Sequence, residues 1–230
     1  MLNYFYIILF SFVSSLFWIL VAVRFIDRKN PEPFKELIKV FLGGCLITVP
    51  VFILVQGAKY FLGQFNLPDF FYILLLSFMV DGLIEELGKF FVLKDGVCNK
   101  SCFDEPIDGL VYGVTVAMGF AFVENILYLA FARPELIILR FITPTLMHAL
   151  ASGIVGYHLY LAKSKKVSSA KKKFYVFFGL LLAIVFHGLF NSVIRYNIFI
   201  NYIPLAILIV LSYIYLLAGL RKAQKEKESQ

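Results

Sequence analysis

Ionisable side chains within otherwise apolar stretches are the first feature of this sequence that points to chemistry. The run Asp-Gly-Leu-Ile-Glu-Glu-Leu-Gly-Lys carries Asp81, Glu85, Glu86 and Lys89. On a helix, Lys89 lies four positions after Glu85 and three after Glu86, so that both carboxylates can reach its ammonium group. Adjacent carboxylates repel each other in a low-dielectric site, and one then favours its protonated form unless a cation compensates. The pattern is typical of a general acid or base; hydration at a helix end is the simpler alternative.

Glu124 and Asn125 follow a stripe of small residues in the next apolar stretch. The stripe has a small residue at every fourth position, namely Gly109, Gly113, Ala117 and Ala121. This spacing lets a neighbouring helix approach closely. We therefore expect Glu124 to lie near a packed face, and the alternative is a single buried carboxylate that bridges two helices.

Two histidines lie within later apolar stretches, each with a polar residue one helical turn further on. His148 is followed by Ser152, and His187 by Asn191. A lone histidine in a membrane is usually a hydrogen-bonding group, but two of them with buried glutamates form the inventory of a water-activating site. The same inventory suits a zinc site with an open position, with His148, His187 and Glu124 as the ligands. The His-Glu-x-x-His pattern of many zinc proteases is absent.

The elements that must position these residues are transmembrane helices. The chain is 60% hydrophobic and only 16% charged, which excludes an ordinary soluble domain. Because about 20 apolar residues span a bilayer, and because lipid cannot satisfy exposed backbone groups, we expect about seven helical spans. They form one all-α domain over residues 1–230, with the catalytic helices at about 70–196. The spans cover approximately residues 4–23, 37–56, 70–93, 107–131, 136–162, 174–196 and 201–219.

The basic residues predict how the chain is oriented. The net charge is +7, and 17 of the 22 lysines and arginines fall on one side of the expected spans against four on the other. The positive-inside rule then places the N-terminus outside and the C-terminus in the cytoplasm. This distribution is a signal of topology and not of nucleic-acid binding. Glu85 lies about 15 residues into its stretch, or about 22 Å at 1.5 Å per residue, which predicts the inner half of the membrane.

At these residues the chain resembles the PrsW family of intramembrane proteases, which is distantly related to the CAAX prenyl endopeptidases. The resemblance covers about residues 80–191 and also includes the run Asp108-Gly-Leu-Val-Tyr-Gly. It rests on four motifs in order along four helices: Glu85-Glu86-x-x-Lys89, Phe120-x-x-x-Glu124-Asn125, His148-x-x-x-Ser152 and His187-x-x-x-Asn191.

The resemblance implies roles for the residues of these motifs. Glu85 and Glu86 supply the base that activates water, and the sequence does not distinguish between them. His148 and His187 bind that water or stabilise the oxyanion, for which Asn191 is a further donor. Lys89 and Glu124 hold charges and ring orientations. We expect no metal, because a third ligand is not obvious, although zinc fits the inventory.

The resemblance also implies a substrate and a location. The substrate is a single-span membrane protein such as an anti-sigma factor, cleaved at site 1 of regulated intramembrane proteolysis. The location is the bacterial cytoplasmic membrane. The alternatives are a CAAX-protease-like enzyme, a non-catalytic immunity or scaffold protein, and an ion-coupled carrier, which would also place Glu and His at mid-membrane. The oligomeric state does not follow from the sequence.

Overall fold

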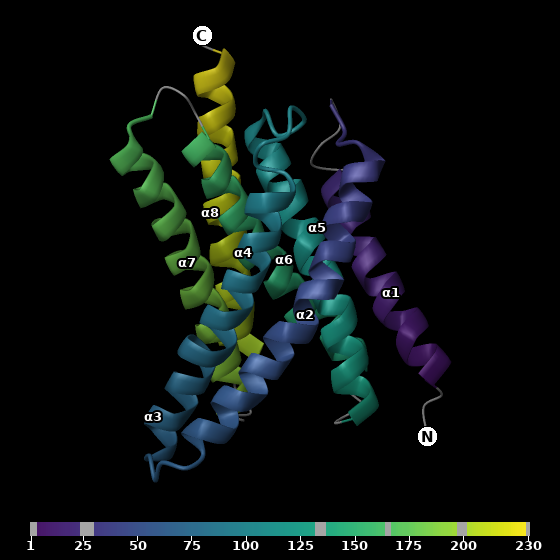
Figure 1. The fold of residues 1–230 in the computed structure, drawn as a ribbon, viewed down its shortest axis with the longest axis vertical. Helices are drawn as coiled ribbons and strands as arrows, with labels where there is room; N and C mark the ends of the chain where they lie inside the picture. Colours follow the sequence, from purple (N-terminus) through teal and green to yellow (C-terminus); the bar gives the residue numbers. More distant parts are fainter. Residues whose placement is uncertain (1–3, 24–29, 132–136, 164–166, 197–201, 229–230) are drawn as a thin grey trace.

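Helices make up nearly all of the described chain, so the predicted all-α class is confirmed. The computed structural model describes residues 4–23, 30–131, 137–163, 167–196 and 202–228, and no strand occurs in these ranges. The elements are α1 (Tyr4–Val21), α2 (Phe34–Leu62), α3 (Asp69–Leu74), the π-helical segment η2 (Leu75–Gly82), α4 (Leu83–Gly96), α5 (Pro106–Phe131), α6 (Ile137–Lys163), α7 (Ser169–Arg195) and α8 (Tyr202–Glu228). They run roughly side by side along one long axis (Figure 1).

Several of the helices are long and apolar enough to span a membrane. Among the described residues, α1, α2, α5 and α7 are the four helices that are long and apolar enough to cross a membrane. The predicted apolar stretches coincide with the observed helices when α3, η2 and α4 are taken together. In Figure 1, α1 begins at one end of the bundle and α8 ends at the other. The number of seven spans and the orientation stay predictions.

Glycines bring helix α5 into close contact with its neighbours at the centre of the bundle. A Cβ atom at Gly109 would lie 2.4 Å from the carbonyl oxygen of Gly156 in α6, and one at Gly113 would lie 2.3 Å from that of Ser152. A Cβ atom at Gly119 would lie 2.0 Å from the carbonyl oxygen of Phe41 in α2. The predicted close approach along the small-residue stripe is therefore confirmed for its two glycines, and the neighbour is α6.

The third apolar stretch is interrupted by a π-helical segment. Helices α3 and α4 are joined through η2, whose eight residues end at Gly82. A π-helical turn contains more residues than an α-helical turn, so it rotates the side chains that follow it, and such segments are frequent at functional sites. Asp81 lies in η2, whereas the two adjacent glutamates lie in the first turn of α4.

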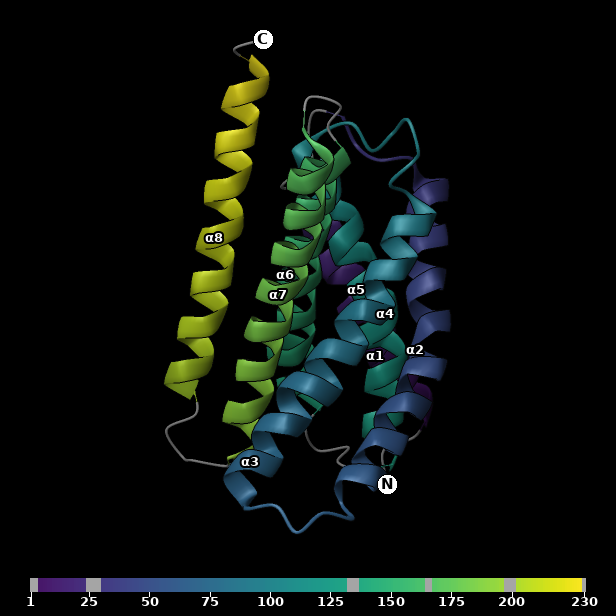
Figure 2. The ribbon, with the colours of Figure 1, turned by 60° about the vertical axis from the view of Figure 1, so that its left-hand side comes forward.

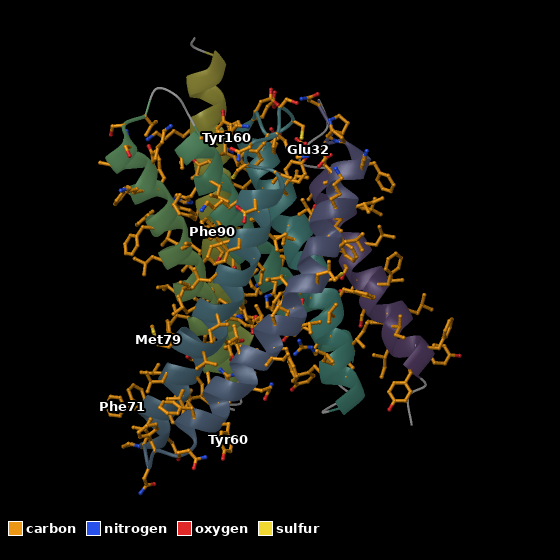
Figure 3. The ribbon with its side chains drawn as sticks, viewed as in Figure 1. Glu32, Tyr60, Phe71, Met79, Phe90 and Tyr160 are labelled. Atoms are coloured by element: carbon orange, nitrogen blue, oxygen red, sulfur yellow. The ribbon has the colours of Figure 1, made fainter. Side chains whose placement is uncertain are left out.

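Apolar side chains cover the outside of the bundle, as expected for a surface that faces lipid. Tyr60, Phe71 and Met79 project outward near the end at which α3 begins (Figure 3). Helix α8 stands at one side of the bundle (Figure 2) and is held to α6 by the hydroxyl of Tyr157, which donates to the carbonyl oxygen of Gly219. The polar residues of the sequence motifs therefore lie inside a bundle with an apolar exterior.

The close packing at Gly119 leads to a test of the fold. Gly119→Ala places a methyl group against the backbone of α2, where it cannot be accommodated without separating the helices. We expect a loss of about 1–3 kcal/mol in the free energy of unfolding, measured by denaturant titration in detergent. The matched control is Gly57→Ala in α2, where a Cβ atom meets no other atom within 4 Å. Equal stability of the two variants would contradict this packing.

Candidate active site

The residues of the four sequence motifs meet inside the bundle. Helix α4 contributes the two adjacent glutamates and Lys89, α5 contributes Glu124, and α6 and α7 each contribute one histidine. Figure 2 shows these helices around a common interior. The rings of His148 and His187 lie with their centroids 4.9 Å apart. Residues that the sequence predicts to share one site therefore lie in contact with one another.

Glu86 is the central acceptor of the cluster. Its side chain is fully buried. Its Oε1 atom lies 2.6 Å from Nζ of Lys89 and 2.8 Å from Nδ1 of His187, and its Oε2 atom accepts a hydrogen bond of 3.1 Å from the hydroxyl of Ser152. A buried carboxylate is stable only when donors and positive charge compensate the loss of water. Glu86 therefore ties α4 to both α6 and α7.

Lys89 and Glu124 together fix the ring of His148. Lys89 Nζ lies 2.9 Å from Nδ1 of His148 and 4.5 Å from the centre of the Phe120 ring. A charged ammonium group has only donors, so Nδ1 accepts, and the proton of the neutral ring is on Nε2. Nε2 lies 3.0 Å from Oε2 of Glu124, which accepts that proton in a hydrogen bond. Both ring nitrogens of His148 thus have partners.

Arg140 supplies positive charge to the opposite side of Glu124. One of its terminal nitrogens lies 3.0 Å from Oε1 of Glu124. Its Nε atom donates to Oδ1 of Asn125 at 2.8 Å, and Nδ2 of Asn125 donates to the hydroxyl of Thr145 at 3.2 Å. The predicted supporting residue Asn125 thus orients the guanidinium group that pairs with Glu124.

Glu85 and His187 face each other without a hydrogen bond between them. Oε2 of Glu85 lies 3.8 Å from Nε2 of His187 and has no hydrogen-bond partner among the described residues. Nδ1 of a neutral His187 donates to Glu86, so its Nε2 carries a lone pair. Two buried acceptors that face each other favour a proton or a cation between them.

A metal ion would fit this arrangement. Glu85, His148 and His187 each offer a ligand atom within 4.8 Å of the others. Two histidines and a glutamate are a known ligand set of catalytic zinc, with bonds of about 2.0–2.2 Å. Glu85 thus provides a third ligand, which is not obvious in the sequence. The sequence instead suggests Glu124 as the third ligand. Because both nitrogens of His148 have partners, its binding to a cation requires one of them to be displaced.

A second polar cluster lies beside the first and is centred on Asp81. Asp81 forms ion pairs with Arg195 and with Lys59, whose Nζ lies 3.3 Å from Oδ1. Asn191 donates to Asp81 at 3.4 Å, and Arg195 donates to the hydroxyl of Ser77 at 2.8 Å. This cluster links α2, η2 and α7 at the edge of the site.

Both clusters border one cavity of about 230 Å³. Its polar lining carries charges of both signs, together with the two histidines. Glu85 and Glu124 line it, whereas Glu86 does not. The lining residues are Lys59, Asp81, Glu85, Glu124, Tyr128, Arg140, Pro144, Met147, His148, His187, Phe190, Asn191, Ile194 and Arg195. The cavity could hold water beside carboxylates, imidazoles and cations, which is the requirement for hydrolysis inside a membrane.

The depth of the site differs from the sequence prediction. Glu124 and His187 lie about two turns before the ends of α5 and α7, so the site is nearer to the end at which α3 begins. The start of α3 and the end of α2 project together beyond the ends of α5 and α7 (Figure 1). Counting residues from the start of the third apolar stretch therefore overestimates how far Glu85 lies from this end of the other helices. On the predicted orientation, which stays a prediction, this end of the bundle faces the outside.

Three cations of the cavity are not among the site residues predicted from the sequence. The charge count assigns Lys59, Arg140 and Arg195 to the outer side of the membrane, and in the structure they lie within α2, α6 and α7. One available signal is that Arg195 follows Asn191 by one helical turn and so lies on the same face. Arg140 is likewise an isolated charge in an apolar stretch.

Comparisons with known proteins agree with the geometry of this site. A family model described as "PrsW family intramembrane metalloprotease" matches residues 32–219. The chain is 32% identical over 176 residues to Protease PrsW of Oceanobacillus iheyensis, which covers 76% of this chain and 78% of the relative. It is 30% identical to Protease PrsW of Clostridioides difficile (98% and 91% covered) and to that of Bacillus subtilis (87% and 87%). No solved structure matches the chain.

The buried ion pair leads to a test of how the cluster is held together. Lys89→Met removes the cation between Glu86 and His148 and leaves a buried carboxylate uncompensated. We expect the free energy of unfolding in detergent to fall by about 3–5 kcal/mol. Lys39→Met is the matched control, because Lys39 forms the same type of pair with Glu36 at 2.8 Å but is half exposed. Its unfolding midpoint should stay nearly unchanged. Similar midpoints for both variants would contradict the assigned role of Lys89.

Proposed function

Since the chain belongs to the PrsW family and is a membrane peptidase, we propose that the cavity between α4, α5, α6 and α7 hydrolyses a peptide bond of a membrane-anchored protein. The observation that supports this most strongly is the pair formed by Glu85 and His187, whose Oε2 and Nε2 atoms face each other 3.8 Å apart beside the cavity, with Oε2 buried and without a hydrogen-bond partner among the described residues. A carrier or scaffold has no need of such a pair, whereas a hydrolase uses it to hold a water-activating group.

We propose that Glu85, His148 and His187 bind a divalent metal ion, and that the ion is zinc. When bound, the ion polarises the scissile carbonyl group and makes a water molecule more acidic. Glu86 holds Nδ1 of His187 and thereby directs Nε2 toward Glu85. Carboxylates in this outer position around a ligating histidine are typical of zinc sites. The donor set and the unsatisfied Oε2 atom of Glu85 support zinc over the metal-free site expected from the sequence.

The remaining residues of the cavity have distinct roles in this proposal. Glu85, and not Glu86, acts at the reacting atoms, because Glu85 faces the cavity while Glu86 is enclosed by its three donors. Glu124, the other carboxylate beside His148, takes up the proton of the attacking water. Asn191 and the neighbouring guanidinium group of Arg195 face the same space and donate to the negative charge that develops on the carbonyl oxygen.

The substrate in this proposal is a single-span protein of the bacterial cytoplasmic membrane. An anti-sigma factor cleaved at site 1 of regulated intramembrane proteolysis fits the family. The position of the cavity supports this choice, because on the predicted orientation it lies toward the outer side of the membrane. A first cut near that side would release the extracellular part of a single-span protein.

Cleavage by purified protein tests this function. We expect wild-type protein in liposomes to cleave one or more members of a panel of single-span, anti-sigma-like proteins. Glu85→Gln and His187→Ala should lower kcat by about 10²–10⁴-fold, because each removes a group at the reacting atoms. Glu86→Gln should lower it by about 10–100-fold, because it acts through His187. Gel analysis and mass spectrometry of the products measure these rates.

The controls separate catalysis from folding and from metal dependence. Glu36→Gln makes the same chemical change outside the cavity and should leave the rate unchanged. A zinc chelator should abolish cleavage, and added zinc should restore it. Cleavage that resists the chelator would contradict the metal site, and equal rates for wild type and Glu85→Gln would contradict the assignment of the active site.

A further inference from the structure

Helices α2 and α5 cross closely and then diverge. At the crossing, a Cβ atom at Gly44 would lie 2.3 Å from the carbonyl oxygen of Val116, and one at Gly119 would lie 2.0 Å from that of Phe41. Beyond this point the two helices separate toward the end at which α3 begins, as Figure 1 shows. The glycines at the crossing hold the helices together at one level, whereas a Cβ atom at Gly57 further along α2 meets no other atom within 4 Å, and a space lies between the two helices there.

This space is a groove of about 390 Å³ with a mostly apolar lining. Phe52 on α2 and Leu127 on α5 are on its two sides. Val51 and Val55 are buried against η2 and α4. The full lining is Thr48, Val51, Phe52, Val55, Gln56, Lys59, Glu85, Phe120, Glu124, Leu127 and Tyr128. The exposed face of Phe52 shows that the groove opens on the outside of the bundle, where lipid is expected.

The groove leads directly to the catalytic cavity. Four residues line both spaces, namely Lys59, Glu85, Glu124 and Tyr128. Two of them are the carboxylates that face the candidate active site. A molecule in the groove would therefore have one end beside the proposed reacting atoms, while its remainder lies between α2 and α5.

We propose that this groove is where the apolar segment of the substrate enters from the bilayer and lies, partly unwound, during cleavage. This inference rests on the proposed function. It adds the route by which the substrate enters and the apolar character of the segment that binds in the groove. A helix keeps its peptide groups hydrogen-bonded to itself, so the segment must unwind before water can attack. An unwound segment needs both apolar contacts and hydrogen-bonding groups, and the groove offers Gln56 and Lys59 beside its apolar walls. A lipid chain would use only the apolar walls.

Site-specific photocrosslinking tests this route. A benzoylphenylalanine is introduced at Phe52, at Leu127 or, as the matched control, at Ile53, which is exposed but does not line the groove. The background is Glu85→Gln, so that the probe stays uncleaved. The probe is a biotinylated single-span peptide with an apolar segment and a glycine-rich outer end, reconstituted with the protein in liposomes. We expect the biotin adduct at Phe52 and Leu127 to exceed that at Ile53 by about tenfold or more.

The possible outcomes distinguish the groove from the proposed function. Equal adduct yields at all three positions, or adducts to phospholipid alone, would overturn the groove as the substrate site, even if wild-type protein cleaves the same peptide. Selective adducts at Phe52 and Leu127 support the groove, even if the wild-type protein does not cleave, in which case only the proposed function fails. Leu127→Trp gives a second measurement, because it should lower kcat/KM for the peptide by about tenfold, whereas Ile53→Trp should not change it.

Discussion

The structure depends on the compensation of charge inside a bundle that has an apolar exterior. Glu86 and Lys89 are almost completely buried, at 0% and 1% exposure, and their charged atoms lie 2.6 Å apart. Neither can be left unpaired without a cost of several kcal/mol. The remaining contacts of this pair are with the two histidines. The ion pair that compensates the buried charges therefore also holds together the helices that carry the site. The glycines of α5 matter for the same reason, because they bring these helices close enough for the contacts to form.

Stability alone does not account for this cluster. Buried ion pairs can often be replaced by apolar residues of similar volume without loss of stability. Ionisable groups retained within membrane helices therefore indicate function. Glu85 also indicates a functional site, because its Oε2 atom is buried without a hydrogen-bond partner among the described residues. The family relationship agrees, since the matching model describes intramembrane proteases. An ion-coupled carrier would share the buried charges but offers no reason for three ligand atoms within 4.8 Å.

Much of the site could be predicted from the sequence because helix geometry fixes short spacings. The pairing of Glu86 with Lys89 follows from their separation of three residues. What the sequence could not provide is the direction of side chains across helices. The π-helical segment before Glu85 has no evident signature in the residue types, yet it rotates the side chains that follow it, including both glutamates. The positive-inside count uses Arg140 and Arg195 only as charges on the outer side, and the packing of α6 and α7 shows that they line the site.

We propose that Glu85, His148 and His187 together bind the metal ion that activates water for peptide hydrolysis. X-ray absorption at the zinc edge, on purified protein loaded with one equivalent of zinc, measures this most directly. We expect nitrogen and oxygen ligands at about 2.0–2.2 Å from the zinc, with scattering from two imidazole rings that falls to one ring in His187→Ala. A shell that contains sulfur, or a spectrum that is unchanged in that variant, would contradict it.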